Sequence, residues 1–276
     1  MKPSPKLKSL LDQMPGPDNR GIIADIDKDK MEKTIAELHQ QGREGVLGLI
    51  EMLVEPGAGD DIKPHHALHC LAVYVTRLDE AARSEFARTV ASQLGGGRPK
   101  GVQAYLIQEL QVAGGPEVAA ALGKALLHEA LCEPAARALV SIGAGAAEQL
   151  RAALPKVKGR CRLAIIQNLG AVHDAASVDA LKAATGAEDR EVRLAAVWGL
   201  VRIADPGCVD AVLKAADTQG YERIQATDAC LRLADNLAAA GKKAEAGKIY
   251  RHLEKTRTDP SERHVREAAR RALAAV

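Results

Sequence analysis

The densest group of side chains that could bind a metal ion or transfer a proton lies in residues 60–70, DDIKPHHALHC. His65 and His69 are four residues apart, so on a helix they share a face, and Asp60 or Asp61 could approach from the preceding loop. The alternative is that the acids cap the helix and the histidines are solvated. No second pair with zinc-site spacing follows, so we expect no metal and keep His65 and His69 as the only candidate ligands.

A second group of side chains could bind an anionic partner. These basic residues would lie along one edge, at the starts of successive helices: Arg98, Lys100, Lys158, Arg160, Arg162, Arg190 and Arg223. The strongest local patch is 151–163, which holds five basic residues and no acid. The net charge of +2 gives no bulk attraction to nucleic acid or anionic membrane. The alternative is a solvated edge whose arginines pair with carboxylates of neighbouring repeats.

Charged pairs at three- or four-residue steps form a third group, on short helices and opposite their apolar stripes. They are Glu148 with Arg151, Asp179 with Lys182, and Asp210 with Lys214. Intrahelical ion pairs and recognition of a partner both explain this spacing, and the two are compatible. We choose these six residues as the contacts of a concave, partner-binding groove.

Catalytic motifs are missing from the sequence. Ser141 lacks the flanking glycines of a nucleophile elbow, and the glycines of 95–101 precede no Gly-Lys-Ser/Thr. The five cysteines are scattered without Cys-x-x-Cys spacing and are expected to be reduced core thiols. We therefore expect no enzyme activity of the chain's own and no cofactor.

The composition indicates that helices position these groups. The chain has 276 residues, of which 47% are apolar and only 2% aromatic, so straight-chain and small residues dominate the core. No apolar run approaches the roughly 18 residues of a membrane span, and residues 1–12 lack the apolar stretch of a signal peptide. The expected fold class is all-α, and the expected location is the cytoplasm, away from membranes.

An internal repeat organises these helices. Residues 162–169 align with residues 193–200 at a shift of 31, and Leu231 follows Leu200 at the same distance. A polar break and a second short apolar segment usually follow, so each unit is predicted to be helix A, a tight turn and helix B. In such units the prolines at 116 and 206 suit first helical positions.

The repeat resembles the HEAT family, in particular the short bacterial type also found in phycobilisome lyases. The best match is Val192-Arg193-Leu-Ala-Ala followed by Leu200, and Asp189 resembles the acid of that family's Asp and Arg ladder. The resemblance implies an armadillo/HEAT-like α-solenoid, a superhelix of stacked antiparallel helix pairs, with B helices lining the inner surface. Residues 233–250 resemble a single tetratricopeptide hairpin.

Two enzyme families built from similar helical repeats are poor matches. The deoxyhypusine hydroxylases need several His-Glu pairs for two irons, and this chain has only His128-Glu129. The helical-repeat DNA glycosylases need aromatic side chains in a basic channel. The only tryptophan, Trp198, falls in the stripe of an A helix and is expected in the core.

One continuous solenoid is therefore predicted, with an N-terminal cap and degenerate repeats in 1–97, HEAT-like repeats in 98–235, and the hairpin with a final unpaired A helix in 236–276. We expect a scaffold that binds another protein or a peptide, as part of a larger assembly or with self-association through the last helix. The alternatives are an accessory module of an enzyme, as the bilin lyase resemblance implies, and a polyanion binder using the edge around 151–163. Nucleic acid is the less favoured partner.

Overall fold

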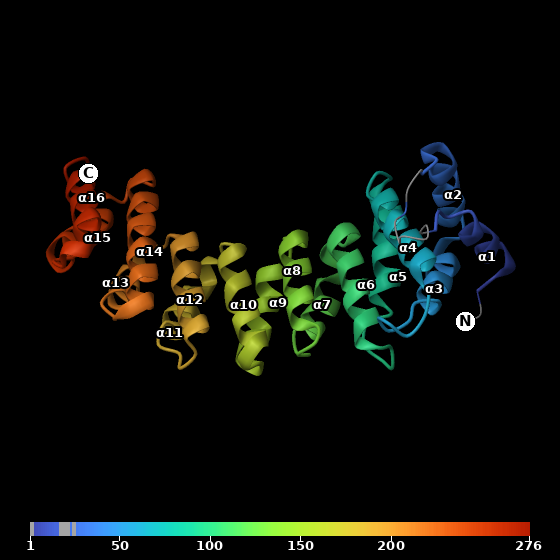
Figure 1. The fold of residues 1–276 in the computed structure, drawn as a ribbon, viewed down its shortest axis with the longest axis horizontal. Helices are drawn as coiled ribbons and strands as arrows, with labels where there is room; N and C mark the ends of the chain where they lie inside the picture. The colour runs from blue at the N-terminus through green and yellow to red at the C-terminus, as the bar shows by residue number, and fades with distance from the viewer. Residues whose placement is uncertain (1–2, 17–22, 24–25) are drawn as a thin grey trace. The chain divides into compact units, whose positions relative to one another are not determined.

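A computed structural model describes residues 3–16, 23 and 26–276. These residues form sixteen α-helices and five 3-10 helices, and no strand occurs among them. The chain divides into two compact units, Met1–Lys156 and Val157–Val276. The predicted fold class, an all-α solenoid, is confirmed, and within each unit the helices stack in pairs (Figure 1).

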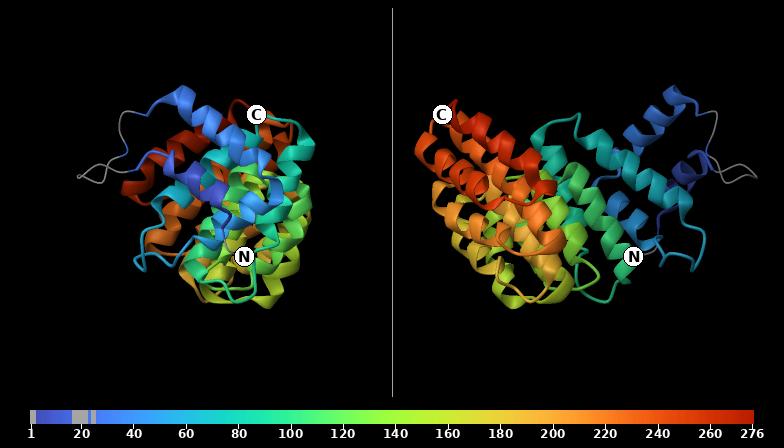
Figure 2. Two further views of the ribbon diagram at one scale, coloured as in Figure 1. Left: turned by 90° about the vertical axis from the view of Figure 1, so that its right-hand side faces the viewer. Right: turned by 60° about the vertical axis from the view of Figure 1, so that its left-hand side comes forward.

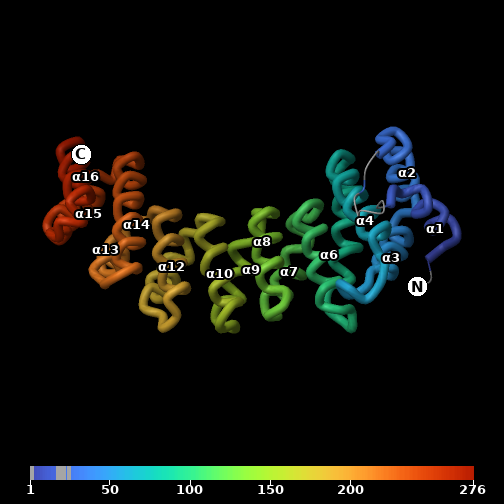
Figure 3. The backbone as a smooth tube through the Cα atoms, in the orientation of Figure 1, coloured from blue at the N-terminus to red at the C-terminus, as the bar shows by residue number. Residues whose placement is uncertain are grey.

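The described residues of unit 1 form nine α-helices, which Figure 3 traces from blue to green. Helices α2, α4, α6 and α8 pack in series as the A layer, and α3, α5, α7 and α9 are their B partners. The bounds are α1 (Pro5–Asp12), α2 (Lys28–Gln40), α3 (Gly42–Glu51), α4 (Ile62–Val75), α5 (Glu80–Ala91), α6 (Lys100–Ala113), η1 (Pro116–Val118), α7 (Ala119–Ala125), α8 (Cys132–Ile142), α9 (Ala146–Ala153) and η2 (Leu154–Lys156).

Unit 2 repeats this arrangement, with one longer A helix, α14, of 20 residues. In the A layer α12 packs between α10 and α14, while the B layer holds α11, α13 and α15 (Figure 2, right-hand view). The bounds are α10 (Gly159–Ala171), η3 (Ala175–Ser177), α11 (Val178–Ala184), α12 (Arg190–Ile203), η4 (Pro206–Cys208), α13 (Val209–Ala216), α14 (Gly220–Ala239), α15 (Lys243–Thr256), η5 (Pro260–Glu262) and α16 (Arg263–Leu273).

Side-chain caps and prolines fix where several helices begin. The carboxylates of Asp27, Asp79 and Asp189 accept backbone N–H bonds at the starts of α2, α5 and α12. Pro116 and Pro206 occupy the first positions of η1 and η4, as the sequence predicts, because a first helical N–H needs no intrahelical partner.

Two glycines bring α10 and α12 into close contact. A Cβ atom on Gly170 would lie 2.5 Å from the Cα atom of Gly199 in the neighbouring helix. Both residues are buried, so the two backbones meet here without an intervening side chain. This contact sets the spacing of two A helices that line the cavity described below.

Paired arginine and glutamate side chains join one repeat of unit 2 to the next. Arg193 of α12 donates two hydrogen bonds to Glu222 of α14, of 2.8 and 2.5 Å. Arg223, the next residue of α14, donates two to Glu262 of η5, of 2.7 and 2.9 Å. Both pairs have the bidentate geometry that strengthens guanidinium–carboxylate bonds, so we call them the Arg–Glu ladder.

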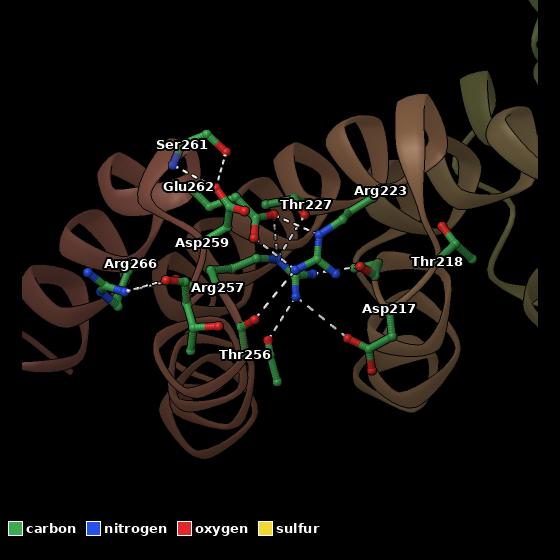
Figure 4. A network of polar contacts seen from close by, with 12 residues as sticks. Asp217, Thr218, Arg223, Thr227, Thr256, Arg257, Asp259, Ser261, Glu262 and Arg266 are labelled. Atoms are coloured by element: carbon green, nitrogen blue, oxygen red, sulfur yellow. Dashed lines mark hydrogen bonds and ion pairs between the residues drawn. The ribbon is translucent and has the colours of Figure 1, made fainter.

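A fully buried arginine completes the C-terminal part of unit 2. Arg257, at the end of α15, donates hydrogen bonds to the carbonyl oxygen of Ala216 at 2.7 Å and to the hydroxyl groups of Thr227 and Thr256 at 3.1 and 2.8 Å (Figure 4). Asp217 and Glu262 lie 3.6 and 3.7 Å from its guanidinium. Burial lowers the pKa of Arg257. The side chain thereby links α13, α14, α15 and η5.

Candidate functional site

A cavity of about 460 Å³ lies on the A layer of unit 2 and extends over three helices. Gln167 of α10 and Gln225 of α14 lie at its sides, and α12 between them supplies most of the lining. We call this cavity the Trp198 groove. Its residues are Gln167, Glu191, Leu194, Ala195, Trp198, Gly199, Arg202, Tyr221 and Gln225.

Two aromatic side chains give the Trp198 groove its apolar surface. Trp198 is only partly buried and Tyr221 is 57% exposed, so both rings are accessible from solvent. The expectation that Trp198 lies in the core is therefore wrong. Its helical spacing places it beside the core stripe of α12, where it lines the groove and is only partly covered by its neighbours. Ile224, 66% exposed on α14, adds apolar surface close to Tyr221 along the helix.

Arginines surround these rings. The guanidinium carbon of Arg232 lies 5.5 Å from the Trp198 ring centre, and that of Arg190 lies 5.8 Å from the Tyr221 ring centre. These are cation–π distances. Arg202, at the last turn of α12, also lines the groove. The groove therefore combines aromatic faces, amide groups and guanidinium groups.

The six predicted contacts lie on the B helices α9, α11 and α13, and only part of the predicted pairing is seen. Lys182 contacts Asp179 at 3.1 Å on α11, the intrahelical pair that the spacing suggests. Asp210 of α13 instead pairs with Lys248 of α15 at 2.5 Å, and Lys214 stays exposed. Asp210 thus joins two B helices, which spacing within one helix could not predict. The remaining two predicted contacts are in unit 1, on α9: Glu148 and Arg151.

The predicted basic edge contains side chains with ion-pair partners in neighbouring elements and side chains that are exposed to solvent. Arg98 pairs with Glu51 and Arg223 with Glu262, each the carboxylate of another repeat. Arg190 pairs with its neighbour Glu191. The other four are exposed at or near the starts of α6 and α10: Lys100, Lys158, Arg160 and Arg162.

The histidine cluster lies against α6 in unit 1 and lines a cavity of about 590 Å³. The Nδ1 atom of His69 lies 3.2 Å from the buried carboxylate of Glu109, and the ring of His65 packs on that of Tyr105 with centres 4.0 Å apart. The two histidines are therefore committed to different partners. Within the described part of the chain, no group of three or more His, Cys, Asp or Glu side chains is arranged to hold a metal ion.

Burial controls the chemistry of this cluster. It raises the pKa of Glu109, which the nearby His69 partly opposes, and it lowers the pKa of His66. The pKa of the Cys70 thiol is raised by burial and by the Glu109 carboxylate. A thiol with a raised pKa is a poor nucleophile, so the cluster offers an imidazole–carboxylate pair without an activated nucleophile.

The cysteines follow the sequence prediction in part. Cys70, Cys208 and Cys230 are free thiols, and burial raises the pKa of the last two to about 12. Cys132 and Cys161 are not free thiols, so the expectation of five reduced cysteines is wrong for these two.

Sequence comparison identifies the repeat. A family model for HEAT repeats matches residues 147–231, which include α10 to α13 and the first part of α14. These residues are HEAT repeats. The Trp198 groove lies entirely within this HEAT region, because its lining residues run from Gln167 to Gln225. No curated protein is similar enough to the chain in sequence to count as a match.

Several solved structures resemble the chain at low identity. An engineered protein has 19% identity and a TM-score of 0.49, with 97% of this chain and 77% of that chain covered. An archaeal HEAT-like repeats protein from Thermococcus onnurineus NA1 has 14% identity and a TM-score of 0.38, with 87% and 97% covered. A designed armadillo repeat protein in complex with the peptide (KR)4 has 19% identity and a TM-score of 0.30, with 97% and 99% covered.

No helix in residues 3–16, 23 and 26–276 is both long and apolar enough to cross a membrane.

Proposed function

We propose that this chain is a scaffold that binds a segment of another protein in the Trp198 groove and performs no catalysis of its own. The observation that carries the proposal is the accessibility of Trp198 and Tyr221 in a cavity that extends over three HEAT helices. Tryptophan, tyrosine and arginine are the residues that most often dominate protein-binding energy, and all three types meet here. Their rigid rings supply contact area at little cost in side-chain entropy.

The A layer supports this proposal better than the B-layer charges chosen from the sequence. Asp179 and Lys182 form an exposed pair within one helix, and such pairs contribute about 0.2 to 1 kcal/mol. Asp210 already has Lys248 as a partner. A protein that bound these charges would displace existing ion pairs, whereas the Trp198 and Tyr221 rings keep solvent-accessible surface although Arg232 and Arg190 lie beside them.

The test compares variants of the two layers. The A-layer variant is Tyr221→Ala, chosen because the side chain is exposed and its loss should not unfold unit 2. The B-layer variant reverses Asp179, Lys182, Asp210 and Lys214. Each protein is immobilised, incubated with a native lysate of the source organism with and without nuclease, and washed with moderate salt. A recovered partner is then purified and titrated against the free chain while Trp198 fluorescence is followed.

The groove would be supported by a partner that is still captured after nuclease treatment, that is not captured by the Tyr221→Ala protein, and that shifts the emission of Trp198 when it binds. Because the chain has a single tryptophan, this signal reports on α12 alone. Loss of the partner only in the charge-reversed variant would move the site to the B layer. Recovery of nuclease-sensitive material alone would favour the polyanion alternative and the edge around 151–163.

A further inference from the structure

The chemistry around the Trp198 groove also indicates which kind of segment it takes, an inference that rests on the proposed function. We infer that the ligand is an extended acidic segment that places an apolar side chain on Trp198 and a carboxylate on Arg202. We base this inference on three features: the charges of the arginines at the groove, the positions of the Gln167 and Gln225 amides, and the spacing of the helices that form the groove.

The charge at the groove favours an acid. No described residue pairs with the Arg202 guanidinium, and the neighbouring histidine contact uses only the Arg202 backbone oxygen. The other two arginines at the rim, Arg190 and Arg232, pair with Glu191 and Asp228 through contacts in which both side chains are more than half exposed. Such exposed ion pairs are weak and exchange readily. A ligand carboxylate could therefore bind the guanidinium of Arg202 directly and also bind those of Arg190 and Arg232 beside their present partners.

The amide groups favour an extended backbone. Gln167 and Gln225 lie on the helices at either side of Trp198, and each amide both donates and accepts hydrogen bonds. An extended segment has free N–H and C=O groups for these amides, whereas a helical ligand uses its own backbone groups internally.

The spacing of the helices gives the length of the segment. Packed helices are about 8 to 10 Å apart, and the Gly170–Gly199 contact puts α10 and α12 at the short end of this range, so α10 and α14 are separated by roughly 16 to 18 Å across α12. An extended chain advances about 3.3 Å per residue, so roughly five residues join Gln167 to Gln225. An octapeptide is therefore a sufficient probe.

The experiment selects peptides from a displayed library of random octapeptides on the full chain. Four proteins are used: wild type, Arg202→Glu, Tyr221→Ala and Arg251→Glu. Arg251 is the matched control, because it is an exposed arginine on the B helix α15 and does not line the groove. Circular dichroism and thermal unfolding establish that each variant is folded.

We expect wild type and Arg251→Glu to select peptides with Asp or Glu beside an apolar residue, and Arg202→Glu to select Lys or Arg at the acidic position. A synthetic octapeptide of the selected sequence should lose at least about fivefold in affinity when its acid becomes the amide, and this loss should disappear on Arg202→Glu.

Failure of the inference and failure of the proposed function give different results. Peptides that depend on Tyr221 but show no acidic preference, or keep one on Arg202→Glu, would overturn the acidic segment and leave the groove in place. Peptides that bind Tyr221→Ala as tightly as wild type, with no change in Trp198 emission, would overturn the groove itself. Peptides of α-helical pattern, with apolar residues at three- and four-residue steps, would overturn the extended backbone.

Discussion

The Nη2 atom of Arg257 donates a hydrogen bond of 2.7 Å to the carbonyl oxygen of Ala216, 41 residues earlier in the chain. Replacing Arg257 by alanine should lower the free energy of unfolding by about 3 kcal/mol or more, since it leaves a cavity and removes buried hydrogen bonds. Urea unfolding of the two proteins measures the difference. Arg251→Ala, on the exposed face of the same helix, should stay within about 0.5 kcal/mol of wild type. A loss below about 1 kcal/mol for Arg257→Ala would contradict the structural role of the buried arginine.

The Arg–Glu ladder should contribute measurable coupling. A double-mutant cycle on Arg193 and Glu222 should give about 1 kcal/mol, because the pair is bidentate and both side chains are partly buried. The comparison pair is Arg232 and Asp228, which is exposed and lies within one helix, for which we expect about 0.3 to 0.5 kcal/mol. Equal coupling energies for the two pairs would mean that the ladder adds nothing to unit 2 beyond an ordinary surface contact.

The glycine contact between α10 and α12 sets two effects against each other. Alanine usually favours an interior helical position by about 0.5 to 1 kcal/mol over glycine. At Gly170 the added Cβ would meet the Gly199 backbone at 2.5 Å, so the helices must separate, at a cost of about 1 to 3 kcal/mol. We expect Gly170→Ala to destabilise the protein in thermal unfolding. Gly186→Ala, where the nearest atom is 3.8 Å away, is the control and should be nearly neutral. A stabilised Gly170→Ala protein would argue against the close contact.

Two carboxylates should give opposite dependences on pH. Burial raises the pKa of Glu109 above its ordinary 4.5, so the stability that its protonated form contributes is present below pH 4.5 and is lost as pH rises through the raised value. The free energy of unfolding of Glu109→Gln, relative to wild type, should therefore increase between about pH 4 and pH 7.

Glu222 is the matched comparison. Its hydrogen bond with Arg193 lowers its pKa below 4.5, so its contribution is present above pH 4.5 and is lost as pH falls through the lowered value. Relative to wild type, Glu222→Gln should become less stable as pH rises from the lowered pKa to about pH 4.5 to 5, and the difference should then stay constant up to about pH 7. If the stability difference from wild type changed with pH in the same direction for both variants, the opposite pKa shifts of Glu109 and Glu222 would be wrong.

The fold was predictable from the sequence because the repeat imposes its own period. Leu169 and Leu200 lie 31 residues apart, and each is buried at the equivalent place in an A helix. Trp198 was misplaced because helical spacing shows only which residues share a face. Helical spacing does not show how much of that face the neighbouring helices cover. Trp198 is only partly covered, because it lies at the edge of the buried face and lines the groove.

The polar partners were predictable only in part. The sequence left two interpretations of the basic edge open, and one was that its arginines pair with carboxylates of neighbouring repeats. Arg223, which pairs with Glu262, agrees with that interpretation. Asp189, in contrast, caps α12 while Arg193 pairs with Glu222. Arg257 has no signal in the sequence, since a buried arginine at a helix end is recognisable only by its partners in space.

The two ladder residues of α14 are adjacent in sequence, with the acid Glu222 bound to the helix before it and the base Arg223 bound to the segment after it. The ladder therefore has a direction along the chain. Consider a second copy of α14 and α15 inserted after α15. The copy of Glu222 would pair with the original Arg223, and the copy of Arg223 would pair with Glu262. Tandem duplication could lengthen unit 2 by whole repeats without any compensating substitution in the ladder.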